Sequence, residues 1–276
     1  MKPNNLFYLI LVAGVIFIFP IFSVASEKAE AKPLVETQKE KQLTPSQPGD
    51  LGEKLSPKGL ENQKSTTPVS IPVYRPPLRG APGGRVGGGT RGVGETLVTL
   101  FVLAPNHVGL TIQEQPNLYW YLSKSTSLPI EVTIIIEEAT HPLLEKRLLI
   151  PAESGIHTLR LKDFNVSLSI GTQYRWFLAI VPEPDRRSRD IIAGGIIERI
   201  EPPEALHKKL IQADKKAMAH IFAEEGIWYD TVATLSELIE TNPDDTVLRE
   251  QRAALLEQVG LSEVAQYDMK QGGFSK

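Results

Sequence analysis

Between Thr96 and Ile200, short apolar runs alternate with Pro, Gly and Asn. The runs are rich in Val, Ile, Leu, Tyr and Trp, which favour strands, and no helical period separates them. Eight short strands at near-regular spacing predict an antiparallel β-sandwich. The expected strands are Leu97–Leu103, Leu110–Gln113, Leu118–Leu122, Ile130–Ile136, Leu143–Ile150, Ile156–Leu161, Tyr174–Val181 and Ile191–Ile200.

One corner of the predicted sandwich carries a more specific pattern. Leu168, Gly171 and Tyr174 stand in the spacing Leu-x-x-Gly-x-x-Tyr, immediately before a strand. In immunoglobulin-like and fibronectin-like sandwiches, a tyrosine at this corner bonds back to upstream backbone. The pattern therefore favours that class of sandwich. The strand Tyr174–Val181 is apolar on both faces, so we expect it to be central.

After Pro202-Pro203 the apolar period becomes helical, which predicts a mainly β protein with a C-terminal α region. Capping residues and glycines delimit the helices. The first expected helix is short and contains Leu206 and Leu210. Three further helices are expected to run from Asp214 to Gly226, from Trp228 to Glu240, and from Asp245 to Gly260.

The stretch from Asp214 to Asp244 resembles one tetratricopeptide repeat. Gly226 falls at the interhelical turn, Trp228 at the aromatic position after it, and Asn242-Pro243 at the end of the second helix. One such unit cannot bury its own apolar face, so it must dock on the sandwich or on another chain. We favour docking on the sandwich.

The N-terminus predicts an export signal. Lys2 is the only charge before an apolar run from Leu6 to Phe22, and Ser23-Val24-Ala25 offers small residues for cleavage after Ala25. The alternative is an inner-membrane anchor formed by residues 6–22, the only membrane contact we expect. Either way, the expected location is the periplasm or cell envelope.

Residues 26–78 have a different composition, dominated by Lys, Glu, Gln, Pro, Ser and Thr, with no aromatic residue before Tyr74. Such a segment buries too little apolar surface to offset chain entropy, so it predicts a disordered tether. The remaining regions are then a Gly-rich segment and sandwich over 79–202 and a helical tail over 203–276.

Charge and cysteine content exclude several classes of function. The formal net charge of −3 gives no pull toward nucleic acid. The absence of cysteine excludes disulfides, thiol chemistry and cysteine-bound metals. Five scattered histidines form no ligand pair, so we expect no metal and no cofactor.

The Gly-rich stretch 79–92 lacks the Lys-Ser/Thr pair of a phosphate-binding loop. We interpret it as a flexible or close-packed lead into the first strand. The alternative is a loop that binds a polymer or an anion, with Arg79, Arg85 and Arg91 as hydrogen-bond donors.

Two further sets of residues are candidates for binding. Trp120 is expected in the core, with Tyr119 and Tyr121 on the opposite face of the strand. Those tyrosines are expected to pack across strands, the alternative being a sugar-binding platform. The cluster Arg186, Arg187 and Arg189 is expected to be a solvated hairpin, the alternative being an anion or partner patch.

A set of short motifs is spread along the chain. The motifs are Arg79–Gly83, Gly89–Gly92, Gly109–Thr111, Leu118–Tyr121, Tyr174–Trp176, Asp190 with Gly195–Arg199, Gly226–Asp230 and Asn242–Asp245. Together they resemble an uncharacterised, mainly cyanobacterial family known as domain of unknown function 928. The resemblance covers about residues 79 to 260 and implies an exported, envelope-associated protein and no particular reaction. Val93 and Val181 stand roughly where the family often has cysteines, and Ile196 where a tryptophan is common.

We therefore expect a non-enzymatic envelope protein that presents a surface to another envelope protein or polymer. A carbohydrate-binding module for peptidoglycan or exopolysaccharide, with Tyr119 or Tyr121 as platform, is the main alternative. A hydrolase that uses a carboxylate such as Asp190 or Glu198 is a third possibility, and it requires two carboxylates about 5–10 Å apart.

Overall fold

The computed structural model describes residues 69–77, 84–87, 98–136, 139–148 and 152–272. These residues belong to one compact unit, Gln63–Lys276. The expected export signal, most of the expected tether, and Arg79 and Arg91 lie outside the described residues. Every helix within these ranges is too short or too polar to span a lipid bilayer.

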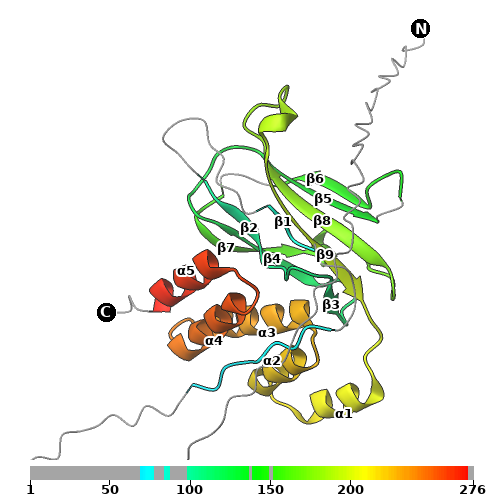
Figure 1. The fold of residues 1–276 in the computed structure, drawn as a ribbon, viewed down its shortest axis with the longest axis vertical. Coiled ribbons are helices and arrows are strands. Elements are labelled where there is room, and N and C mark those ends of the chain that lie inside the picture. The colour runs from blue at the N-terminus through cyan, green and yellow to red at the C-terminus, as the bar shows by residue number, and fades with distance from the viewer. Residues whose placement is uncertain (1–68, 78–83, 88–97, 137–138, 149–151, 273–276) are drawn as a thin grey trace, which may run out of the picture. The chain divides into compact units, whose positions relative to one another are not determined.

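The described strands form two sheets above a layer of helices (Figure 1). The eight strands expected from the apolar runs are present, and β1 is an additional short strand within the Gly-rich stretch. The larger sheet has the order β1 (Val86–Gly87), β9 (Ile191–Arg199), β8 (Gln173–Ile180), β5 (Ile130–Ile136), β6 (Leu144–Arg147), and β3 (Gly109–Thr111) also pairs with β9. The smaller sheet has the order β2 (Leu100–Val102), β4 (Asn117–Leu122), β7 (Gly155–Arg160).

Antiparallel pairing dominates both sheets, as the apolar runs predict. The exception among the described strands is β3, which runs parallel to β9. β8 lies between β5 and β9, so its predicted central position is confirmed. At the corner before β8, the Tyr174 hydroxyl accepts a hydrogen bond from the Ser169 amide at 3.0 Å, which is the upstream backbone contact that the spacing predicts.

The two sheets share one hydrophobic core. Leu118, Trp120 and Leu122 of β4 are buried together with Trp176 and Leu178 of β8. The alternation predicted for β4 is confirmed, because Tyr119 and Tyr121 lie on the other face, toward the helices. The smaller sheet is therefore covered on both faces.

The helical region contains five helices within the described residues, where the sequence predicts four. Asp214 caps α2 by accepting from the Ala217 amide at 2.7 Å, and Asp245 caps α4, as expected. α5 was not anticipated. The helices are α1 (Glu204–Gln212), α2 (Lys215–Glu224), α3 (Trp228–Thr241), α4 (Thr246–Glu257) and α5 (Ser262–Gly272).

Candidate functional site

The start of α3 docks the helical layer onto the sheets. Trp228 Nε1 donates to the Leu103 carbonyl at 2.8 Å. The Tyr229 hydroxyl accepts from Trp176 Nε1 at 2.9 Å and donates to the Ile196 carbonyl at 3.1 Å. These bonds are buried and join a helix to both sheets. The expectation that the tail docks on the sheets is therefore confirmed.

Two glycines lie against Tyr229: a Cβ atom at Gly109 would be 2.5 Å from its Cε2 atom, and Gly195 lies beside its hydroxyl. A Cβ atom at Gly195 would lie 2.6 Å from Ala104 Cβ and 3.3 Å from the Tyr229 oxygen. Burial also raises the pKa of the Tyr229 phenol, so this group stays protonated and can donate. The glycine in β3 therefore makes room for the Tyr229 ring, and the glycine in β9 makes room for Ala104 beside the hydroxyl.

Asp230 is buried in the first turn of α3 and ties this helix to the segment after β3. Its carboxylate accepts from the Ile112 amide and from Gln113 Nε2, each at 3.2 Å. Burial raises the pKa of this carboxyl to about 6, although the hydrogen bonds favour its charged form. The Trp228-Tyr229-Asp230 sequence is thus a structural joint.

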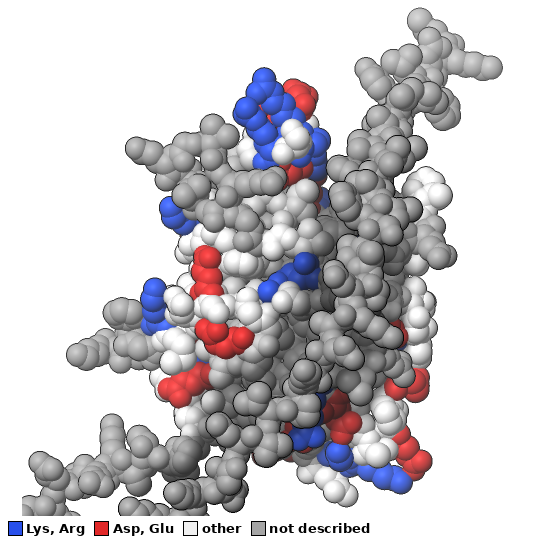
Figure 2. All heavy atoms as spheres, viewed as in Figure 1, with Lys and Arg blue, Asp and Glu red and all other residues white. Residues whose placement is uncertain are grey.

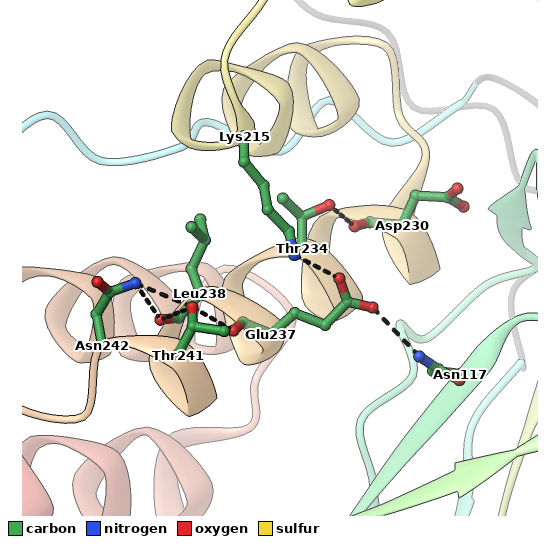
Figure 3. A network of polar contacts seen from close by, with 8 residues as sticks. All are labelled: Asn117, Lys215, Asp230, Thr234, Glu237, Leu238, Thr241 and Asn242. Atoms are coloured by element: carbon green, nitrogen blue, oxygen red, sulfur yellow. Dashed lines mark hydrogen bonds and ion pairs between the residues drawn. The ribbon is translucent and has the colours of Figure 1, made fainter.

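A second joint lies farther along α3 (Figure 3). Glu237 accepts from Asn117 of β4 at 3.3 Å and pairs with Lys215 of α2 at 2.8 Å. One carboxylate thereby connects β4, α3 and α2. Together with the bonds of Trp228 and Tyr229, it fixes α3 along its length.

Residues 69–77, here called the strap, cross the helices as an extended segment, drawn in cyan in Figure 1. Gln251 Nε2 donates to the Ser70 carbonyl at 2.7 Å. Gln258 donates from Nε2 to the Pro72 carbonyl at 2.9 Å and accepts on Oε1 from the Tyr74 amide at 2.8 Å. These bonds recognise main-chain groups of the strap. The predicted tether runs to residue 78, whereas its last described residues are part of the fold.

Tyr74 anchors the strap. Its ring packs edge-on against Trp228 with centroids 4.9 Å apart, and its hydroxyl lies 3.3 Å from His107 Nε2. His107 Nδ1 faces the Val108 carbonyl at 2.9 Å, so Nδ1 carries the proton and Nε2 accepts from Tyr74. A second fixed point follows, where the Arg75 amide donates to the Ala223 carbonyl at 3.0 Å.

The strap also limits which residue can occupy position 226, in the turn between α2 and α3. Gly226 has a φ of 74°, a conformation that side chains rarely adopt. A Cβ atom at Gly226 would lie 2.6 Å from the Arg75 carbonyl oxygen. The interhelical glycine therefore serves both the turn and the passage of the strap.

A pocket of about 230 Å³, here called the interlayer pocket, opens between the smaller sheet and helices α3, α4 and α5. Burial raises the pKa of Tyr119 to about 12, and Glu240 and Glu237 act in the same direction. The polar residues that line the interlayer pocket include Tyr119, Thr158, Ser236, Glu240, Arg249 and Arg252.

The two arginines of this pocket differ in how well they are satisfied. Arg252 donates to Asp268 from Nε at 2.6 Å and from Nη2 at 2.7 Å, and to Ser236 Oγ at 2.8 Å. Arg249 comes no closer than 3.8 Å to Asp268, and its buried Nε donates to no described residue. Arg252 is thus structural, whereas Arg249 retains donor capacity.

The two tyrosines proposed as a sugar platform are covered by helices. Tyr119 is 3% exposed and Tyr121 is 5% exposed. The Tyr121 ring packs against Tyr267 of α5 with centroids 5.1 Å apart. The platform interpretation is therefore wrong for these rings, and their role is packing between layers.

Arg85 acts inside the fold. Its Nη1 donates to the carbonyls of Ala104 and Val259, at 3.0 and 3.1 Å, and its Nη2 to that of Gly260 at 3.3 Å. Burial lowers its pKa. The suggested role as an anion donor is corrected, because Arg85 joins the Gly-rich stretch to the carbonyls that end α4. Arg79 and Arg91 lie outside the described residues.

The arginines of the charged hairpin have acidic partners. Arg186 and Arg189 both pair with Glu183. Arg187 pairs with Glu131 at 2.7 Å and with Asp190 at 2.9 Å. At the top of Figure 2, basic and acidic side chains lie side by side on this hairpin. This pairing favours the solvated hairpin over an anion patch.

The two carboxylates considered for hydrolysis do not form a pair. Asp190 precedes β9 and Glu198 lies near its end, so they are about 25 Å apart at the rise of a strand. Glu198 instead shares a largely apolar pocket of about 350 Å³ with Glu201, beside Ile170 and Ile200. Among the described residues, no group of three or more His, Asp or Glu could hold a metal.

The sequence analysis predicts neither the strap nor the interlayer pocket. Ile71-Pro72-Val73-Tyr74 is an apolar island in a polar segment, which is a signal for an ordered stretch. Gln251 and Gln258 stand seven residues apart, a spacing that places them on one face of a helix. The buried pair of Arg252 and Asp268, at the interlayer pocket, could not be predicted from apolar periodicity, because both side chains are charged.

The fold and its sites define a class of protein: a two-sheet β domain with a helical layer docked on both sheets. Within this class, the chain belongs to the family described as Domain of Unknown Function (DUF928), whose family model matches residues 86–269. The resemblance inferred from the motifs is thereby confirmed. No curated protein shows significant similarity to the chain.

Proposed function

We propose that this chain is a non-enzymatic, exported envelope protein that presents an interaction surface to another envelope protein. In this proposal the sheets form an immunoglobulin- or fibronectin-like sandwich, and the tail is tetratricopeptide-like. Two features support that assignment: the tyrosine corner at Tyr174, and the packing of α2 on α3 and of α4 on α5 as successive hairpins. Export rests on the apolar run from Leu6 to Phe22 and the small residues before Ala25.

The strap carries the proposal. Pro72 and Tyr74 point inward and are buried, whereas Ile71 is 47% exposed and Val73 57% exposed. Alternation of this kind is that of a strand with one face on the core and one face outward. The helices therefore hold an extended segment with its apolar side chains facing solvent.

Val247 extends this surface. It is exposed and lies one helical turn before Gln251, on the same face of α4 that contacts Ser70. Ile71, Val73 and Val247 are here called the strap face. Exposed apolar side chains on one ordered segment and on the helix that it crosses favour a protein partner.

The carbohydrate-binding alternative has less support. Its platform residues, Tyr119 and Tyr121, are buried beneath helices. An aromatic sugar platform needs an open ring face, and these rings pack against helical side chains. A protein partner on the strap face is therefore the function that the geometry favours.

Site-specific photocrosslinking tests this proposal. A photoreactive residue replaces Val73 in the full chain, expressed in cells that naturally export it, and the crosslinked envelope proteins are identified. The matched control places the same residue at Met269, an exposed apolar position on α5. We expect one adduct from position 73 that position 269 does not give.

A second pair of variants separates a specific contact from general stickiness. Ile71→Lys should abolish the position-73 adduct, whereas Met269→Lys should leave it unchanged. The proposal is wrong if position 73 gives no adduct, or if both positions give the same set of adducts.

A further inference from the structure

The interlayer pocket holds two charged side chains whose hydrogen-bonding capacity is not fully used by the described residues. Arg249 reaches Asp268 only at 3.8 Å, and the two oxygens of Asp268 already accept from Arg252. Glu240 is exposed at the pocket and forms no ion pair with a described residue. The other carboxylate on the same stretch of α3, Glu237, is engaged by Lys215 and Asn117.

The arginine side of the pocket suits a carboxylate. A buried N–H without an acceptor is costly, and the Arg249 Nε is in that position. A guanidinium presents donors in a planar fork that matches the two oxygens of a carboxylate. Arg252 lies one turn along α4, but its charge is balanced by Asp268 and its donors are occupied, so Arg249 is the arginine available to a ligand.

The opposite charge at Glu240 makes a simple anion a poor fit. An anion beside Arg249 would be repelled by this carboxylate, whereas an ammonium group would be attracted to it. Uncharged hydroxyls from Tyr119, Thr158 and Ser236 also line the pocket, and the rest of the lining is Ile156, Ile239, Pro243 and Tyr267. The Tyr119 phenol stays protonated at neutral pH and can donate.

The volume of about 230 Å³ lies below the range of drug-sized ligand sites, so it limits the ligand to a small molecule. The molecule must carry a carboxylate and an ammonium close together, because Arg249 and Glu240 line one small pocket. We propose that the interlayer pocket binds a free α-amino acid with a small side chain, its carboxylate toward Arg249 and its ammonium toward Glu240. This site is separate from the strap face and does not depend on the function proposed there.

Calorimetric titration of the full chain with glycine and with alanine tests the site. We expect saturable binding, with a dissociation constant between about 1 μM and 1 mM for so small a ligand. Acetate supplies only the carboxylate, methylammonium only the ammonium, and glycylglycine separates the two charges. Each of these three probes should bind at least about tenfold more weakly than glycine, a factor that corresponds to one lost charged contact.

Two variants locate the binding. Arg249→Gln and Glu240→Gln should each weaken glycine binding about tenfold or more. Lys270→Gln changes an exposed charge on α5 away from the pocket and should leave binding unchanged. The probe series on the unaltered chain keeps the test decisive even if a variant folds poorly. Three results would overturn the proposal: no binding of glycine or alanine, acetate or glycylglycine binding as tightly as glycine, or full affinity in Glu240→Gln.

Discussion

Gln258 binds the main chain on either side of Val73, with the Tyr74 amide donating to its Oε1 at 2.8 Å. Its Nε2 donates to the Pro72 carbonyl at 2.9 Å, so one side-chain amide satisfies two backbone groups. This is the pattern by which a neighbouring strand would hold an extended segment. Val73, between the two bonds, is thereby directed to solvent.

Replacement of Gln258 by Ala should release the strap locally. The Tyr74 amide loses its acceptor, so its hydrogen exchange should accelerate, and the free energy of unfolding should fall by about 1–2 kcal/mol. Gln266→Ala, at an exposed position on α5, is the matched control. Unchanged exchange at Tyr74 in the Gln258 variant would show that this side chain does not hold the strap.

Replacement of Tyr229 by Phe should weaken the joint between helices and sheets. The Trp176 indole and the Ile196 carbonyl would both lose a buried partner, which should lower the free energy of unfolding by about 2–4 kcal/mol. Chemical denaturation followed by tryptophan fluorescence measures this loss. Tyr267→Phe is the control, because the Tyr267 hydroxyl makes no hydrogen bond with a described residue, and it should be close to neutral.

The buried pair Arg252 and Asp268 should show strong coupling. Arg252→Met or Asp268→Leu alone leaves one buried charge without its main partner and should cost about 3–5 kcal/mol. The double variant should cost much less than the sum of the two, which a double-mutant cycle detects. Additive losses would contradict the pairing. The exposed pair of Lys209 and Glu225 should show little coupling in the same experiment.

Asp230 should make stability fall as pH rises. Burial raises the pKa of its carboxyl from an ordinary 3.8 to about 6, so the folded chain holds this proton more tightly than the unfolded chain. The favourable contribution is complete below about pH 4 and is lost as pH rises to about 6, by roughly 3 kcal/mol. Asp230→Asn should remove this slope when the free energies of unfolding of the two proteins are compared across that range. Parallel curves would contradict the prediction.

The strands could be predicted because their buried residues alternate with less buried ones along the sequence. In β8, the residues Tyr174, Trp176, Leu178 and Ile180 form one buried face. The sequence pattern predicts both that face and the hydrogen bond of Tyr174 at the corner. β1 was missed because Val86–Gly87 has too few residues to alternate. The parallel course of β3 was missed because a strand of three residues carries no information on direction.

The helical layer was predicted less completely, for a different reason. α5 turns Asp268 inward to pair with Arg252, so part of its buried face is a charged residue that apolar periodicity does not count. The role of the candidate arginine Arg85 could not be predicted either, because the sequence does not show which acceptors surround it. The sequence suggests that Arg85 is a free donor, yet its acceptors are main-chain carbonyls: that of Ala104 and, more than 170 residues away in sequence, those of Val259 and Gly260 just after α4.

The account depends most on the strap face being a docking surface. The most direct measurement is a titration of the purified protein captured at position 73 against the full chain and against two charge variants. We predict saturable binding that Val73→Lys weakens by tenfold or more, about 1.4 kcal/mol or above, and that Met269→Lys leaves unchanged. Equal affinity of all three proteins would contradict the claim.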